Sequence, residues 1–66
     1  MLSGYSVVRL KQLEAMIPVP VGSKGAVLIV HSSNPQAYEV EFVDDSGKSL
    51  GTFTVEEKNL EEIKSR

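Results

Sequence analysis

The acidic residues near the middle of the chain are the side chains best suited to bind a hard metal cation. Asp44 and Asp45 are adjacent, and Glu39 and Glu41 lie a few residues before them. Carboxylate oxygens are the ligands that Ca²⁺ and Mg²⁺ prefer. A calcium loop, however, places its acids at alternate positions around a glycine and ends in a later glutamate, and the sequence does not contain that pattern. We therefore expect these acids to belong to a hairpin turn and a solvent-facing strand, and we predict no metal site.

Two further motifs suggest a chemical function, and the sequence supports neither. His31 has the side chain of a general base, but there is no cysteine for it to activate and no identifiable serine partner. Residues 22–25, Gly-Ser-Lys-Gly, offer backbone N–H groups to a phosphate. They lack the spacing of a P-loop, and the residues after them favour a strand rather than a helix. We predict that the protein is not an enzyme and that it uses no cofactor or small-molecule substrate.

Aromatic and basic side chains raise a third class of function, the binding of nucleic acid. Aromatic rings stack on unpaired bases, and the chain has Tyr5, Tyr38, Phe42 and Phe53. All of these except Tyr5 fall at positions expected to face a core. The seven basic residues are scattered among nine acidic ones, and the net charge of −2 has the wrong sign for gathering phosphates. Nucleic-acid binding is therefore the alternative function, not the favoured one.

These side chains must be positioned by a very small structure. The chain has 66 residues and is predicted to form a single domain, residues 1–66. It has no cysteine and one histidine, so neither a disulfide nor a structural zinc site is expected to stabilise it. The first residues show no basic stretch followed by an apolar one, so no signal peptide is expected. Together with the missing cysteines, this favours a cytoplasmic protein with no membrane contact.

Hydrophobic patterning predicts an all-β fold. Residues 26–31 give the strongest strand, because the first five of them are apolar, and residues 37–43 alternate between apolar and polar side chains. Residues 44–47, Asp-Asp-Ser-Gly, are typical of a tight hairpin turn. Gly51 marks a bulge or bend in the strand that follows. The predicted strands are residues 7–10, 26–31, 37–43 and 50–55.

The C-terminal segment is predicted to form a short helix over residues 56–64. Thr54 and Glu57 fit a capping box, and Leu60 and Ile63 would dock the helix on the sheet. A closing strand over the same residues is the alternative. A long first connection, three strands joined by hairpins and a final helical turn together predict a small SH3-like barrel of four to five antiparallel strands.

The strand 26–31 has more apolar residues than one buried face requires. If Val27 and Ile29 point inward, its other apolar side chains point outward and need a cover. That cover is either the preceding loop and the C-terminal helix, or a second molecule, and both interpretations stay open. Exposed apolar patches mark interaction sites. The residues predicted for a protein-interaction surface are Leu28, Val30, Ile17, Val19 and Val21.

Two segments of the sequence carry more information than their hydrophobic patterning. Residues 22–30 read GSKGAVLIV, and residues 37–47 read AYEVEFVDDSG before TFTV at 52–55. They resemble a family of small bacterial proteins known only as domain of unknown function 4926, over residues 6–60. The resemblance implies an SH3-like barrel without an assigned activity and, for some members, an accessory role beside neighbouring proteins, as in toxin–antitoxin-like pairs. The chain departs from the family at residues 61–66, which look more helical.

The sequence thus predicts a non-enzymatic interaction module rather than a catalyst. It would self-associate as a homo-oligomer or bind a partner protein, in the manner of an accessory or antitoxin-like protein. The predicted binding surface is the face formed by Leu28 and Val30, a free strand edge, or the long loop. The alternative is a nucleic-acid-binding barrel of the KOW type, which rests on fold analogy.

Overall fold

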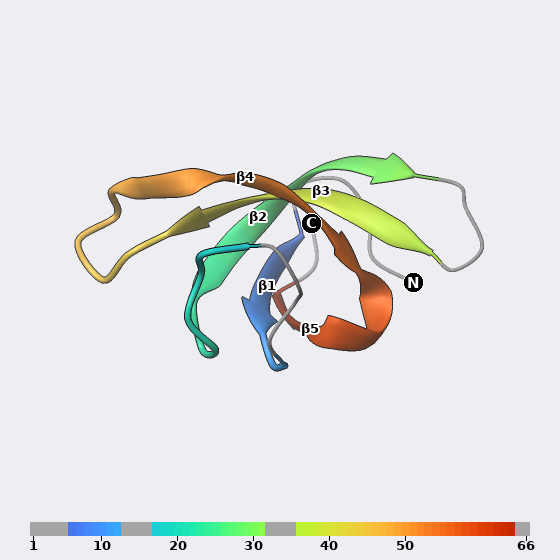
Figure 1. Ribbon diagram of the computed structural model, residues 1–66, viewed down its shortest axis with the longest axis horizontal. Helices are drawn as coiled ribbons and strands as arrows, with labels where there is room; N and C mark the ends of the chain where they lie inside the picture. Colours follow the sequence, from blue (N-terminus) through green and yellow to red (C-terminus); the bar gives the residue numbers. More distant parts are fainter. Residues whose placement is uncertain (1–5, 13–16, 32–35, 65–66) are drawn as a thin grey trace.

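The computed structural model describes residues 6–12, 17–31 and 36–64, and these residues form one antiparallel β-sheet. The prediction of an all-β chain is confirmed (Figure 1). Within these ranges no helical segment is long and apolar enough to cross a membrane. The elements are β1 (Val7–Leu10), β2 (Lys24–His31), β3 (Ala37–Val43), β4 (Ser49–Glu56), the 3₁₀ turn η1 (Glu57–Asn59) and β5 (Leu60–Lys64).

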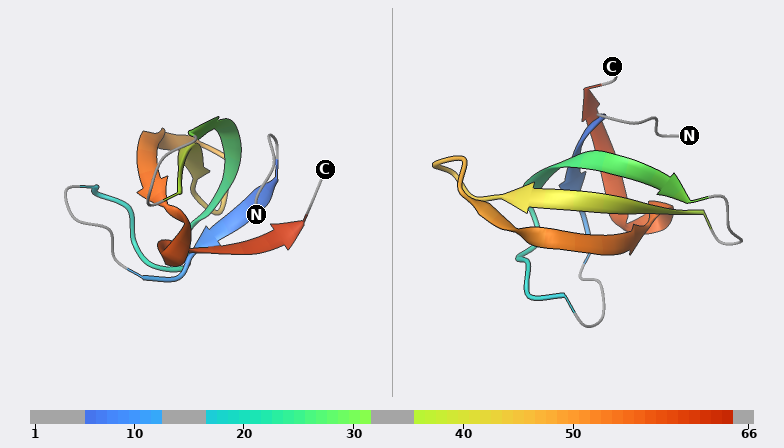
Figure 2. Two further views of the ribbon diagram at one scale, coloured as in Figure 1. Left: turned by 90° about the vertical axis from the view of Figure 1, so that its right-hand side faces the viewer. Right: turned by 90° about the horizontal axis from the view of Figure 1, so that it is seen from above.

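The strands lie in the order β4-β3-β2-β1-β5, so the first four form a meander and β5 returns to the free side of β1. β2 belongs to both halves of the sheet, because its first residues pair with β1 while almost its whole length pairs with β3. Figure 2 shows the result, in which β2, β3 and β4 form one layer and β1 and β5 turn away from it. In the described part of the chain the sheet is not closed, because β4 pairs only with β3 and β5 only with β1.

The strands predicted from patterning are confirmed, with small changes at their ends. β1 and β3 have the predicted bounds, β2 begins two residues earlier than predicted, and β4 extends by one residue at each end. The predicted hairpin turn is present, with Gly47 at φ 87°. Gly51, at φ 120°, follows the bulge where the β3–β4 register shifts. In both places only glycine adopts the positive φ at little cost.

The predicted helix over residues 56–64 is wrong. Only Glu57–Asn59 form a 3₁₀ turn, and the next five residues form β5, which pairs with β1. Thr54 lies in β4, and its hydroxyl donates to Oε1 of Glu39 (2.7 Å) instead of capping a helix. So short a helix would be marginal in water. As a strand, the segment satisfies the open edge of β1 and buries Leu60 in the core.

The core holds inward-facing side chains from all five strands and from the first loop. Its largest members lie on β3, where Tyr38 and Phe42 are fully buried as the alternation predicts. The Tyr38 hydroxyl donates to the Glu57 carboxylate (2.8 Å), so η1 satisfies the polar end of a buried ring. The core cluster consists of Val8, Leu10, Val19, Val27, Tyr38, Val40, Phe42, Val55 and Leu60.

Gly25 allows β2 to pass close to β3. A β-carbon at this position would lie 2.8 Å from the carbonyl oxygen of Glu41 and 2.8 Å from Cγ1 of Val40. Both distances are well below the usual contact of about 3.5–4.0 Å. Gly25 is a buried strand residue opposite Phe42.

A register shift in β2 reverses the predicted orientation of its later residues. The pairing with β3 skips Leu28, so Ile29 opposes Glu39. Ile29 therefore faces outward and is 53% exposed, whereas Val30 packs against the core. The prediction that Ile29 points inward and Val30 outward is wrong, because one extra residue shifts the alternation of every side chain after it.

Candidate interaction surface

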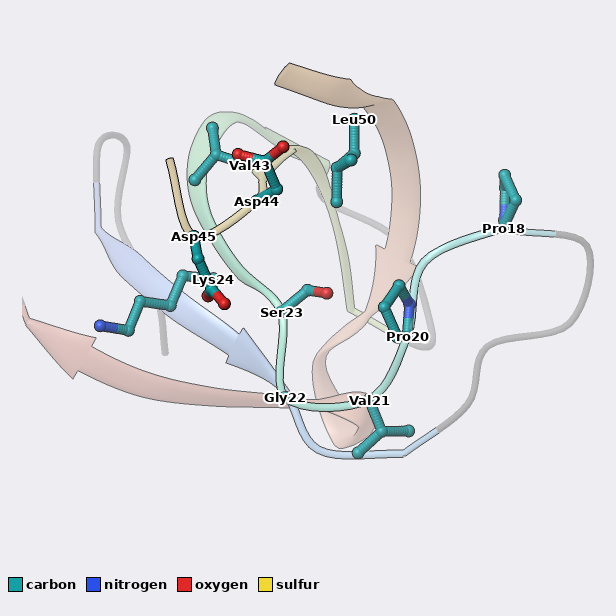
Figure 3. Close-up of a pocket in the computed structure, with 10 residues that line it drawn as sticks. All are labelled: Pro18, Pro20, Val21, Gly22, Ser23, Lys24, Val43, Asp44, Asp45 and Leu50. Atoms are coloured by element: carbon teal, nitrogen blue, oxygen red, sulfur yellow. The ribbon is translucent and has the colours of Figure 1, made fainter. Parts of the chain in front are cut away.

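A groove of about 510 Å³ opens between the first loop and the β3–β4 hairpin. Pro18, Pro20 and residues 21–23 of the loop form one wall together with Lys24 at the start of β2, and the turn and strand ends of the hairpin form the other (Figure 3). Large apolar side chains remain exposed on both walls, with Val21 51% exposed on the loop and Leu50 37% exposed on β4. Exposed apolar surface of this kind marks sites of interaction.

Local backbone features hold these apolar walls in place. Pro18 and Pro20 fix their own φ angles and keep the residue before each of them extended. Val19, between them, is only 2% exposed and anchors the loop in the core. On the opposite wall Leu50 is the extra residue of the β4 bulge, outside the regular alternation. Figure 3 shows its side chain pointing toward the loop.

The hairpin turn gives the groove a negatively charged end. Oδ1 of Asp44 accepts hydrogen bonds from the Ser46 hydroxyl (2.8 Å), the Ser46 N–H (2.9 Å) and the Lys48 N–H (2.9 Å). The Ser46 hydroxyl, followed by the Lys48 N–H, lowers the pKa of Asp44 because both stabilise the ionised carboxylate. Asp45 lines the same wall, and Lys24 lines the loop side. The Asp44 carboxylate is therefore ionised at neutral pH.

The groove begins at the start of β4, whose outer edge has no partner strand within the described ranges. The Glu57 N–H donates to the carbonyl of the residue before β3 (3.0 Å). Antiparallel strands alternate between hydrogen-bonded and non-hydrogen-bonded pairs. Along this register Val55 and Phe53 direct their N–H and C=O groups to β3. Thr54 and Thr52 therefore direct theirs away from the sheet, where another strand would pair with them.

The two edges of the sheet differ in charge. Residues 49–55 of β4 contain no charged side chain, whereas β5 has Glu61, Glu62 and Lys64 among its five residues. Charged side chains on an edge strand oppose pairing with another chain, and a long uncharged edge promotes it. β4 is therefore the edge better suited to receive a further strand.

The five residues predicted for the interaction surface are divided between the core and the surface. Val19 belongs to the core, and Ile17 and Val30 pack against it, so these three are covered within one chain. Val21 and Leu28 are exposed. Val21 lines the groove, whereas Leu28 lies on β2 and is not among the groove residues.

Three of the polar residues considered for chemistry, His31, Glu39 and Glu41, have polar partners on the surface of the sheet. Nε2 of His31 lies 3.5 Å from Oε1 of Glu39, which also accepts the Thr54 hydroxyl. Glu41 accepts the hydroxyl of Ser49 (3.0 Å). Among the residues that the structure describes, no three His, Cys, Asp or Glu side chains gather as a metal site would require.

The segment 22–25 connects the loop to β1 and β2. The Gly22 N–H donates to the carbonyl of Leu10 (2.7 Å), and the Leu10 N–H donates to the carbonyl of Ser23 (2.9 Å). The Gly22 N–H is therefore already bonded to the chain, which leaves the segment poorly suited to hold a phosphate.

The aromatic residues follow their predicted roles where the structure describes them. Tyr38 and Phe42 are buried, so neither offers a free face for stacking, and Phe53 is partly buried against the core. Tyr5, the one aromatic residue predicted to be free, lies outside the described residues.

Sequence patterning did not identify Leu50 or the outer edge of β4 as parts of a binding surface. The sequence feature that could have identified Leu50 is Gly51, since a bulge beside a strand glycine adds one residue and turns its side chain out of the regular alternation. No sequence feature predicts the groove itself, because its walls come from residues far apart in the sequence.

Comparison with known proteins identifies the family of the chain. No curated protein and no solved structure matches the chain. A family model described as Domain of unknown function (DUF4926) matches residues 5–62, which is most of the chain. It is the family that the strand motifs resemble, so that prediction is confirmed. The chain belongs to the family Domain of unknown function (DUF4926).

Proposed function

We propose that the protein is a non-enzymatic interaction module that binds another protein chain at the β4 side of its sheet. The observation that carries this proposal is the outer edge of β4, which is uncharged over residues 49–55, has no partner strand among the described residues and lies beside a groove with exposed apolar side chains. A strand edge supplies backbone donors and acceptors, and a groove supplies a place for an apolar side chain. These are the two parts of recognition by strand addition.

The proposal that the module is not an enzyme rests on what its polar side chains do. The Asp44 carboxylate holds the hairpin turn, and Glu39 and Glu41 accept hydrogen bonds from hydroxyl groups on β4. These contacts pair carboxylates with surface threonine and serine residues at the sheet face. They do not hold a nucleophile against a base in the way that covalent catalysis needs.

For the fold we propose an SH3-like barrel that is left open between β4 and β5. The strand order, the long connection from β1 to β2 and the 3₁₀ turn before the last strand support this assignment. An experimental structure tests it directly. We expect β5 to lie beside β1, and a helix over residues 56–64 would contradict the assignment.

Two variants of Thr54 test whether β4 is the binding edge. Thr54→Pro removes an N–H that points away from β3, and its ring obstructs the approach of a neighbouring strand. Proline is tolerated at such edge positions, so the variant should still fold. Thr54→Val is the matched control, because it keeps the N–H and the branched side chain and removes the hydroxyl that contacts Glu39. Both variants are first checked for folding by circular dichroism.

Light scattering after size-exclusion chromatography, across a dilution series, measures self-association, and affinity capture from cell extract measures partner binding. We expect an association that Thr54→Val retains and Thr54→Pro loses. A protein that stays monomeric and captures no specific chain would contradict the proposed function. An association that is indifferent to Thr54→Pro would contradict the choice of β4.

A further inference from the structure

The part of the chain that contains β3 and β4 is strongly acidic. Residues 37–57 contain six acidic residues and one lysine, whereas the rest of the chain has three acidic and six basic residues. Lys58, just beyond this range, pairs with Glu56 (3.8 Å). The five other acidic residues still outnumber the one lysine, so the charge beside β4 is negative although the net charge of the chain is only −2. The six acidic residues are Glu39, Glu41, Asp44, Asp45, Glu56 and Glu57.

Two of these acids lie on the outer face of the sheet beside β4. The Thr54 hydroxyl reaches Glu39 (2.7 Å) and the Ser49 hydroxyl reaches Glu41 (3.0 Å), so both carboxylates share a face with the exposed side chains of β4. A strand added to β4 would lie two strand spacings, about 10 Å, from β3. Long basic side chains on that face of the added strand would approach both carboxylates.

The inner face of β4 has the opposite character. Phe53 packs against the core, and its ring covers Gly51, where an added β-carbon would lie 3.0 Å from the ring. An added strand would place its inward side chains beside Phe53. At the end nearest the bulge, they would reach the groove at Leu50 and Val21. These positions favour apolar side chains.

We propose that β4 binds an extended segment of a partner protein in which apolar and basic side chains alternate. The apolar side chains face Phe53 and the groove, and the basic ones face Glu39 and Glu41. This inference rests on the proposed function and adds the chemistry of the partner. A second copy of the chain is the poorer occupant. Pairing β4 with β4 would place the acidic residues 37–57 of one copy beside those of the other, and their like charges would repel.

Labelled peptides test this proposal by fluorescence anisotropy. The first peptide alternates valine and arginine over eight residues, the length of β4. The second alternates valine and glutamate, and the third has the composition of the first arranged as a valine block and an arginine block. Each is titrated with the full chain, with Thr54→Pro and with Thr54→Val, at about 50 mM and about 300 mM salt.

We expect the alternating valine–arginine peptide to bind with a dissociation constant between micromolar and millimolar, because a free peptide loses backbone freedom on binding. The block peptide and the glutamate peptide bind at least about tenfold more weakly, since the first does not match the two faces of the strand and the second is repelled. Thr54→Pro weakens binding by about tenfold or more relative to Thr54→Val, because both variants lose the hydroxyl and only the valine variant keeps the N–H. Raising the salt concentration weakens binding without abolishing it.

Each other outcome overturns the proposal in a recognisable way. Equal binding of the alternating and block peptides, unaffected by Thr54→Pro, would show charge attraction without strand addition. Equal binding of the arginine and glutamate peptides, lost in Thr54→Pro, would show strand addition without the proposed charge preference. No binding of any peptide would remove β4 as a site for this class of segment. A dimer lost in Thr54→Pro would make a second copy the occupant. The proposed function fails separately, when light scattering and capture both show no association.

Discussion

Replacing Gly25 by alanine tests how closely β2 and β3 pack at the centre of the sheet. The new methyl group would lie 2.8 Å from the carbonyl oxygen of Glu41, 2.8 Å from Cγ1 of Val40 and 3.0 Å from Cδ1 of Phe42. Ordinary contacts between carbon atoms are about 3.5–4.0 Å. The methyl group therefore fits only if the two strands move apart or the neighbouring side chains change their positions.

Overpacking of a core usually costs about 1–3 kcal/mol. We expect a value in the upper part of this range for Gly25→Ala, roughly 2–3 kcal/mol, because one of the close atoms is a backbone carbonyl held in the β2–β3 ladder. In a domain of this size each 1 kcal/mol lowers Tm by about 4–8 °C. The variant should therefore melt roughly 10–20 °C below the wild type.

Thermal and urea denaturation followed by circular dichroism measure this change. Gly47→Ala is the control, since its β-carbon would meet nothing within 4 Å and the cost comes only from a φ of 87°. That cost is about 1–2 kcal/mol. Val40→Ala removes one of the atoms that the new methyl group would meet. The double variant should therefore lose less stability than the two single variants lose when their losses are added. An unchanged Tm for Gly25→Ala, or strictly additive losses, would refute the reasoning.

Four further substitutions test other parts of the structure. Tyr38→Phe removes the hydroxyl that donates to Glu57 (2.8 Å), and urea titration should show a loss of about 1–2 kcal/mol. Asp44→Asn tests pH dependence: the pKa of Asp44 is lowered in the folded state, so its contribution is present above about pH 4 and is lost as the pH falls through the folded-state pKa. Wild-type stability should therefore fall more steeply below pH 4 than that of Asp44→Asn, and parallel curves would contradict this. Val19→Ala should cost about 2 kcal/mol and Val21→Ala less than about 0.5 kcal/mol in urea titration, because the first side chain is buried and the second exposed. Equal losses would show that the loop does not dock as described.

Most of the sheet could be predicted from sequence because its signals are local. The alternation in β3 and the Asp-Asp-Ser-Gly turn each lie within one segment, and the structure contains both. The C-terminal segment could not be assigned in this way. Thr54 and Glu57 suit the start of a helix locally, but the pairing with the open edge of β1 and the burial of Leu60 depend on residues about 50 positions earlier in the chain. Long-range pairing overrides local propensity there.

The orientation of the β2 side chains shows a second limit. A bulge at Leu28 changes the face of Ile29 and Val30, and nothing in a run of apolar residues shows where the extra residue falls. The candidate surface was therefore predicted only in part. The loop and a free strand edge were predicted as possible sites, but the groove beside Leu50 exists only once the loop and the hairpin lie side by side.

Amide hydrogen exchange along β4, measured by NMR, tests the central claim most directly. In the free protein we expect the amides of Thr52 and Thr54 to exchange rapidly and those of Phe53 and Val55 to be protected, because only the latter two face β3. Addition of the alternating valine–arginine peptide should protect Thr52 and Thr54 and leave the other two unchanged. Protection of all four amides in the dilute free protein, or no change at Thr52 and Thr54 when the peptide is present, would contradict the account.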